Sequence, residues 1–269
     1  MRGALRYIIA IVMAIGALIS YFTLRQDNPV TGEKQHIGIS TEQEVALGLQ
    51  AAPQMSQEYG GEISDPQILA GVNQIGQRIA QQSDATKAEY QYQFHVLADN
   101  ETINAFALPG GQVFITMGLL KLLQTPGELA GVLGHEIGHV IARHSAEQMA
   151  KTQLTQGLSG AAVMATYDPS NPSTQAGPAV AALIGNLVNM KFGRDDELEA
   201  DRLGVRLIGQ AGYDPNAMIN VMKILQQAAG SNSQPEFFST HPNPENRITM
   251  IQTAIEKEFP SGVPANLEK

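Results

Sequence analysis

The sequence contains no cysteine. Disulfide bonds, thiolate metal sites, a cysteine nucleophile and a bacterial lipoprotein anchor are therefore excluded. The redox state of the compartment stays open, because a domain of this size needs no disulfide to be stable. Basic residues are also scarce, with 17 Lys and Arg against 26 Asp and Glu, so the net charge is −9. Since no basic stripe occurs anywhere, a nucleic-acid partner is not expected.

Internal repeats and a boundary between two globular domains are missing from the pattern as well. A chain of 269 residues is long enough for one sizeable domain with a small appendage. Its apolar content of 43% is typical of a globular protein and not of a disordered one. We therefore expect a single folded body.

Long apolar runs are rare too, and the chain has one, YIIAIVMAIGALISYFTL at residues 7–24. A helix of this length spans roughly 27 Å, close to the thickness of a bilayer core. A buried core helix is the alternative, but this run is apolar on all faces. No small-x-small cleavage site follows it, which favours an uncleaved anchor over a signal peptide. We predict a signal-anchor at residues 1–25, a polar linker at 26–39 and the catalytic body at 40–269.

The charges that flank the apolar run predict the orientation of the anchor. Arg2 and Arg6 precede the run together with the terminal amine, whereas Arg25 and Lys34 follow it. Positive charge gathers on the cytoplasmic side of membrane segments. The N-terminus is therefore expected in the cytoplasm and the body outside it.

Local signals predict helices and two strands in the body. Capping residues and apolar periodicity place helices from Thr41 (with Glu44 closing a capping box), at 65–82, from Thr125, near 178–191, at 195–211 up to Gly212, and from Asp214. Alternating residues predict a half-buried strand around 90–97, with His95 on its solvated face. A second strand is expected at Gln112–Met117, after a Pro109–Gly111 turn, and a loop at 167–179.

The stretch GELAGVLGHEIGHVIARHS carries the strongest chemical signal. His135 and His139 lie one turn apart on the same face of the expected helix, so both imidazoles can reach one ion. Glu136 lies beside that face, where it can act as a general base on water. Such a pattern arises by chance in roughly 1% of chains of this composition. We predict a catalytic zinc site, while His144 lies off the metal-facing stripe and is expected in solvent.

A catalytic zinc site needs a third protein ligand. The segment RDDELEAD at residues 194–201 offers Glu197 and Asp201, which share a helical face, whereas Glu199 points away. Glu197 can ligate the metal while Asp201 accepts a hydrogen bond from a ligating histidine. The alternative is an acidic helix start that is merely solvated.

Four ordered segments, INAFALPGGQVFITMGLL, HEIGHVIARH, RDDELEAD and THPNPENR, resemble the HtpX, BepA and CAAX-prenyl-protease family of zinc metallopeptidases. The resemblance covers about residues 40–253. It implies an α+β fold, a mainly helical zincin-like domain with a small β-sheet whose edge strand lies over the zinc. It also implies Glu197 as third ligand of one Zn²⁺ per chain, His241 as a fourth contact or oxyanion stabiliser, and Arg247 as a supporting residue.

Substrate binding is expected at the strand before the metal helix. In peptidases of this kind an extended peptide pairs with an edge strand, and we assign that strand to Val113–Met117, with Asn104, Val113, Phe114 and Ile115 as contacts. An ordinary core strand is the alternative. His241 likewise has a plain alternative, a surface histidine in a proline-rich loop.

These features predict a zinc endopeptidase that is anchored in the inner membrane through residues 7–24 and faces the periplasm or an equivalent compartment. By the resemblance, its substrates would be misfolded or unassembled envelope proteins. The runner-up is a chaperone-like scaffold that keeps the zinc fold, but binding alone needs no general base such as Glu136. We expect no helical-repeat domain within these residues. Intramembrane cleavage of prenylated substrates is not expected, since a single segment can span.

Overall fold

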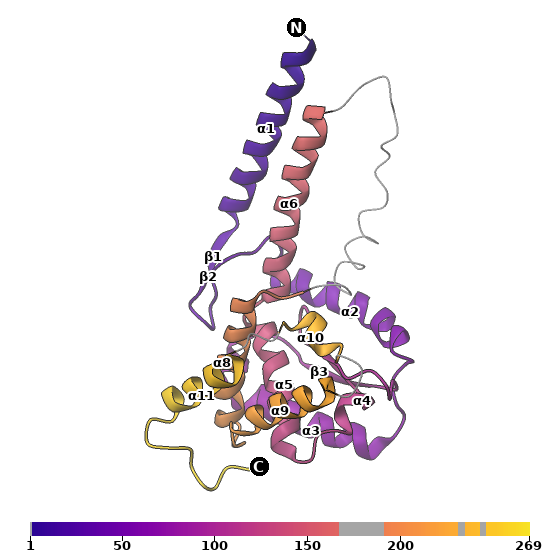
Figure 1. Cartoon of the computed structure of the whole chain (residues 1–269), viewed down its shortest axis with the longest axis vertical. Helices are drawn as coiled ribbons and strands as arrows, with labels where there is room; N and C mark the ends of the chain where they lie inside the picture. The colour runs from indigo at the N-terminus through magenta and orange to yellow at the C-terminus, as the bar shows by residue number, and fades with distance from the viewer. Residues whose placement is uncertain (1, 167–190, 231–234, 243–245) are drawn as a thin grey trace.

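The computed structural model describes residues 2–166, 191–230, 235–242 and 246–269 (Figure 1). The predicted loop at 167–179 and nearly all of the predicted helix at 178–191 lie outside these ranges. A compact body carries a stalk of two helices, α1 (Arg2–Thr23) and α6 (His144–Thr166), which run side by side away from it (Figure 1). The N-terminus lies at the far end of the stalk.

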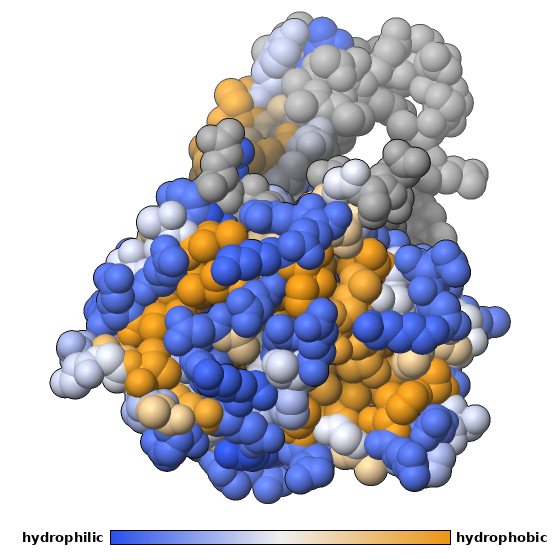
Figure 2. All heavy atoms as spheres, turned by 60° about the horizontal axis from the view of Figure 1, so that its bottom comes forward, coloured by the Kyte–Doolittle hydropathy of each residue, from blue (hydrophilic) through white to orange (hydrophobic). Residues whose placement is uncertain are grey.

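Helix α1 is the one described helix that is long and apolar enough to cross a membrane, over Leu5–Thr23 with a mean hydropathy of 2.0. Only 6% of that segment is buried. Among the residues that the structure describes, nearly all exposed large apolar side chains lie on α1, and the exceptions are Leu49, Leu158 and Met250. Hydrophilic side chains instead cover much of the opposite end of the body, with hydrophobic surface between them (Figure 2). Exposed apolar surface of this extent marks a contact with a membrane or with another protein.

Residues 26–39, predicted as a polar linker, include a short β-hairpin. Strands β1 (Arg25–Asp27) and β2 (Lys34–His36) form an antiparallel hairpin below the stalk. The buried Asn28 side chain donates to Ile141 O at 2.8 Å, and the buried Gln35 side chain donates to Ala142 O. These carbonyls end helix α5 (Pro126–Ile141), so the hairpin caps that helix where it has no further backbone donors.

Two helices precede the main sheet. Helix α3 (Pro66–Gln82) begins as predicted, with the Asp65 side chain accepting two backbone N–H groups. Helix α2 (Thr41–Glu58) is present, but its N-cap is Ser40 and its capping box closes with Gln43. The predicted partner Glu44 is instead buried, where its carboxylate pairs with Arg143 at 2.7 Å. The helix begins one residue earlier than predicted, so Gln43 closes the capping box at the surface, whereas Glu44 points into the protein.

The main sheet has the order β3–β5–β4, with β3 at Gln93–Leu97, β4 at Ala105–Leu108 and β5 at Gln112–Thr116. Strand β5 pairs parallel with β3 and antiparallel with β4, so the prediction that Val113–Met117 is an edge strand is wrong. Strand β4, which the sequence reading did not identify, lies at the edge of this sheet. His95 is also not simply solvated, because it stacks on Phe114 at 4.5 Å and contacts Glu62.

Helices cover both faces of the sheet. Val96, Val113 and Ile115 belong to the larger core, which α3 and α5 share with the C-terminal helices. Phe106 and Phe114 belong to a smaller core beneath α2. The remaining described elements are η1 (Asp84–Ala88), α4 (Met117–Leu120), α8 (Arg194–Gln210), α9 (Ala217–Ala229), α10 (Phe237–Thr240) and α11 (Arg247–Glu258). The predicted α+β class, mainly helical with small sheets, is confirmed.

Candidate metal centre

Helix α5 carries two of the candidate ligands on one buried face. Thr125 caps its start by accepting the backbone N–H of Glu128, and Pro126 occupies the first turn, as predicted. His135 and His139 are 3% and 2% exposed, and their Nε2 atoms lie 3.1 Å apart. The i, i+4 spacing therefore brings both imidazoles to one point, as helical geometry requires.

Helix α8 packs unusually close to α5 and supplies the carboxylate. A Cβ added to Gly138 would lie 2.9 Å from Ala200 O, and one added to Gly134 would lie 2.4 Å from the Ile208 side chain. Only glycine at these positions permits this separation of the helices. Glu197, fully buried, thereby comes within 3.5 Å of His135 Nε2 and 3.4 Å of His139 Nε2.

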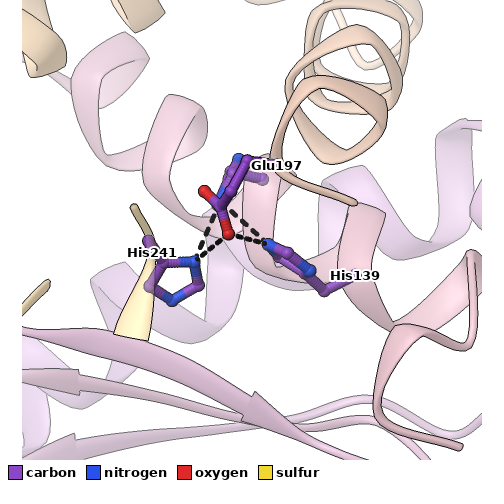
Figure 3. Close-up of side chains that lie close together, drawn as sticks. His139, Glu197 and His241 are labelled. Atoms are coloured by element: carbon purple, nitrogen blue, oxygen red, sulfur yellow. Dashed lines mark hydrogen bonds and ion pairs between the residues drawn. The ribbon is translucent and has the colours of Figure 1, made fainter. Parts of the chain in front are cut away.

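His241 reaches the same point from the segment after α10. Its ring stacks on Phe237 with centroids 4.4 Å apart, and it is completely buried. Its Nδ1 lies 2.9 Å from Glu197 Oε1 and 3.4 Å from His135 Nε2. Figure 3 shows His139, Glu197 and His241 converging from three separate segments. His241 thus belongs to the cluster and is not a surface histidine.

The four side chains suit a tetrahedral cation. One atom from each of His135, His139, Glu197 and His241 lies within 4.8 Å of all the others. Ligands at 2.0–2.1 Å from a central ion would be about 3.3 Å apart, close to the separations observed here. Glu197 Oε2 and His241 Nε2 are buried without a hydrogen-bond partner in the protein. Buried polar atoms without a hydrogen bond in the protein call for a bound ion or water.

The charges in the cluster favour metal binding. Burial alone would raise the pKa of Glu197, but the charge of His241 and hydrogen bonds from the three histidines hold that pKa well below its usual value. Burial lowers the pKa of His139 well below its ordinary value. The carboxylate is therefore ionised and His139 is neutral at pH 7, which are the protonation states that ligate a metal.

Glu136, which the sequence predicts as a general base, lies beside the cluster. Its carboxylate is fully buried, and neither oxygen has a hydrogen-bond partner in the protein. His241 Nε2 lies 3.7 Å from Glu136 Oε1. Burial raises the pKa of Glu136 above its ordinary value. A carboxylate with a raised pKa and free oxygens is suited to accept a proton at neutral pH.

Asp201 and Arg247 support His135 from behind. Asp201 Oδ1 lies 3.0 Å from His135 Nδ1, and Arg247 donates to both Asp201 oxygens at 2.7 and 2.9 Å. Arg247 also pairs with Glu197 at 3.1 Å. Burial would lower the pKa of His135, but hydrogen bonds to Asp201 and Glu197 raise it to about 9. This arrangement matches the hydrogen-bonded carboxylate expected behind a ligating histidine.

The proposed substrate contacts divide into two groups. Val113, Phe114 and Ile115 lie on the central strand β5, whose two edges are already paired, so a peptide cannot add to them. Asn104, which directly precedes β4, borders a narrow cleft beside His241. The cleft is also lined by Tyr59, Phe106, Leu108 and Phe192. The Asn104 Oδ1 atom is buried without a partner, although its Nδ2 group donates to Glu236 at 3.0 Å.

His144 was predicted in solvent, and that prediction is wrong. Helix α5 ends at Ile141, and Arg143 adopts a left-handed conformation with φ 56°. The chain turns there, so His144 at the start of α6 comes back to His139, with their Nδ1 atoms 2.8 Å apart. His144 is 1% exposed. No sequence signal marks this turn, because Arg rarely adopts positive φ and the helical stripe alone places His144 elsewhere.

Comparison with known proteins agrees with this geometry. Residues 66–255 match the model of peptidase family M48. The β-barrel assembly-enhancing protease of Escherichia coli K12 is 34% identical over 192 residues, which are 69% of this chain and 38% of that protein. The mitochondrial metalloendopeptidase OMA1 of Schizosaccharomyces pombe is 32% identical over 245 residues, covering 88% of this chain and 70% of that protein.

The chain spans less than half the length of the enterobacterial relatives that it matches, and the Yersinia pestis protein, 32% identical, is covered over 46% of its length. The family match nevertheless covers α3 to α11, and so includes His135, Glu136, His139, Glu197 and His241. The resemblance drawn from the four sequence segments is thereby confirmed. This chain belongs to peptidase family M48.

Proposed function

We propose that this protein is a zinc-dependent endopeptidase. The observation that carries the proposal is Glu136, a buried carboxylate without a protein partner, beside a cluster of His135, His139 and Glu197. Three protein ligands with a nearby free base are the arrangement of a catalytic zinc site, and the fourth member of the cluster, His241, lies on the segment after the short helix α10. Bound there, zinc would act as a Lewis acid on the scissile carbonyl and on water.

The chain's own residues account for the proton transfers. Glu136, with its raised pKa, accepts a proton from water during attack and passes it to the leaving amine. His241 Nε2 faces Glu136 at 3.7 Å, where an N–H on this nitrogen would stabilise a developing negative charge. Asp201 and Arg247 hold His135 in one orientation through their short hydrogen bonds.

Strand β4 is the proposed substrate platform in place of β5. It has one neighbour in the sheet, β5, and residues of β4 line the cleft that ends at His241. An extended peptide can add to such an edge through its main chain, which gives broad specificity. Asn104, with an unpaired buried Oδ1, is a candidate to contact the peptide backbone. Phe106 and Leu108 make the cleft apolar, which favours unfolded segments over native surfaces.

His241 also suggests how the resting protein is held idle. Its Nδ1 lies 2.9 Å from Glu197 Oε1 and 3.4 Å from His135 Nε2, so His241 would hold a bound metal together with the other three residues. A fourth protein ligand would compete with water and substrate for the metal. We propose that His241 occupies this fourth position in the resting state and moves when substrate enters the cleft.

Helix α1 is the proposed anchor, and the body is proposed to face an extracytoplasmic compartment such as the periplasm. Support comes from its 19-residue apolar segment, and from Arg2 and Arg6 before it. Misfolded or unassembled envelope proteins are the proposed substrates, and one relative is named for the enhancement of β-barrel assembly.

The test compares the full-length protein in detergent with its Glu136→Gln variant. We expect both to hold about one zinc per chain, and the variant to lose cleavage of unfolded casein by several orders of magnitude. Loss of zinc from the variant would assign Glu136 to the metal and not to the base. Equal and low cleavage by both proteins would support the scaffold alternative.

A further inference from the structure

His144 is a buried imidazole for which the proposed reaction has no use. It lies between two side chains, with Nδ1 2.8 Å from His139 Nδ1 and Nε2 3.5 Å from Glu199 Oε2. Phe192 covers the pair by stacking on His139 at 4.2 Å. His144 is 1% exposed, so water does not replace these contacts. A buried polar side chain with two polar partners of this kind requires an explanation.

The direction of the hydrogen bond follows from the orientation of His139. Its Nε2 faces the cluster, 3.1 Å from His135 Nε2 and 3.4 Å from Glu197 Oε1. A nitrogen that ligates a metal carries no proton, so the proton of neutral His139 is on Nδ1. That N–H donates to His144 Nδ1, which must then be the acceptor. The proton of His144 is consequently on Nε2, the atom that points to Glu199.

We infer that His144, with Glu199 behind it, is a positioning residue that fixes the tautomer and ring orientation of the ligand His139. The inference rests on the proposed metal centre. It gives the two ligating histidines different supports, a carboxylate held by Arg247 for His135 and a neutral imidazole for His139. Loss of such a support typically weakens metal binding by about tenfold to a hundredfold.

The inference also assigns a role to Glu199, which accepts the hydrogen bond from His144 Nε2. The helical pattern turns Glu199 away from Glu197, and the structure keeps it out of the four-residue cluster. Its side chain is 16% exposed and lies against His144. The left-handed backbone conformation of Arg143 turns the chain after α5, so that His144 lies against His139. The Arg143 guanidinium forms an ion pair with Glu44 at 2.7 Å.

The test measures zinc affinity by chelator competition for full-length protein and two variants. His144→Leu keeps much of the volume without an acceptor and should bind zinc about tenfold to a hundredfold more weakly. His144→Asn places an acceptor oxygen near the position of Nδ1 and should restore most of that affinity. His95→Leu, which removes a histidine from β3, is the control and should leave zinc affinity unchanged. In the cobalt-substituted proteins, the visible absorption spectrum should differ from that of the wild type more for His144→Leu than for His144→Asn, and should not differ for His95→Leu.

The outcomes separate this inference from the peptidase proposal. Equal zinc affinity in wild type and His144→Leu would overturn the positioning role, whatever the activity. Zinc binding without casein cleavage in the wild type would overturn the peptidase proposal alone, and absence of zinc binding would overturn both. If His144→Leu does not fold, His144→Gln replaces it, because its amide reaches the position of Nε2 and leaves Nδ1 without a substitute. Weaker binding by Gln than by Asn is then the expected result.

Discussion

Replacement of Arg247 by methionine should destabilise the metal-free protein strongly. The guanidinium is 2% exposed and makes three short contacts, two with Asp201 and one with Glu197. Methionine fills much of the space and leaves two buried carboxylates without their cation. Removing one member of a buried ion pair costs about 3–5 kcal/mol in unfolding free energy, because the remaining charge is uncompensated.

The lower end of that range is expected at pH 7. The pKa of His135 is about 9, so His135 remains a cation beside Asp201 when Arg247 is gone. Saturating zinc should recover part of the loss, since the metal supplies positive charge next to Glu197. Arg247→Lys keeps the charge but not the planar fork that contacts both Asp201 oxygens. It should fall between wild type and Arg247→Met.

Urea unfolding of the full-length protein in detergent, with and without zinc, measures these differences. Arg202→Met is the matched control, because Arg202 is an exposed cation on α8, the helix that carries the Arg247 partners Asp201 and Glu197. Its effect should stay within about 0.5 kcal/mol. The reasoning is refuted if Arg247→Met and Arg202→Met lower the metal-free stability equally, or if zinc recovers nothing in Arg247→Met while still binding.

Further predictions concern the ligands and their surroundings. Glu197→Gln should weaken zinc binding far more than Glu199→Gln in a chelator assay, and the reverse order would contradict the assignment of the helix face. His135 should make the stability of the metal-free protein fall as the pH rises. Its pKa is about 9 in the folded protein and about 6.5 in the unfolded chain, so its contribution to stability is complete below pH 6.5 and is lost as the pH rises through 9. Thermal melts at several pH values can follow this loss. Gln35→Ala should lower the free energy of unfolding by about 1–3 kcal/mol, because the buried carbonyl of Ala142 at the end of α5 loses its hydrogen bond. A loss below about 0.5 kcal/mol, the size typical of a surface substitution, would contradict the capping role. His241→Ala should raise casein cleavage if the imidazole mainly blocks the metal, and abolish it with zinc retained if it mainly stabilises negative charge; no change in either would return His241 to a structural role.

Local chemistry in the sequence was enough to predict the main helices and the metal ligands. Asp65 and Thr125 cap their helices as their side chains predict, because capping involves residues only two or three positions apart. The spacing of His135 and His139 likewise follows from the helical repeat. Glu197 could be proposed because the order of the motifs resembles a known family. In each case the determining residues are close in sequence or recur as a pattern.

Tertiary structure alone decided which strand lies at the edge of the sheet. Alternation of side chains predicts a strand, but not its neighbours, and β4 takes the edge because β5 pairs on both sides. The close packing of α5 on α8 at Gly134 and Gly138 could not be predicted from the sequence either, because a glycine within a helix does not indicate which other helix packs against it. Sheet order and helix separation depend on residues far apart in the chain.

The surroundings of the ligands also depended on the tertiary fold. Gln35 caps α5 across 107 positions of sequence, and Arg247 reaches Asp201 across 46. His144 is close in sequence to His139, yet its contact requires Arg143 to adopt a left-handed conformation that only its pairing with Glu44 and the surrounding packing can hold. Periodicity extrapolates a regular helix past its end, and so it misplaced His144. The sequence therefore identified the candidate ligands of this site, whereas long-range contacts determined what holds them in place.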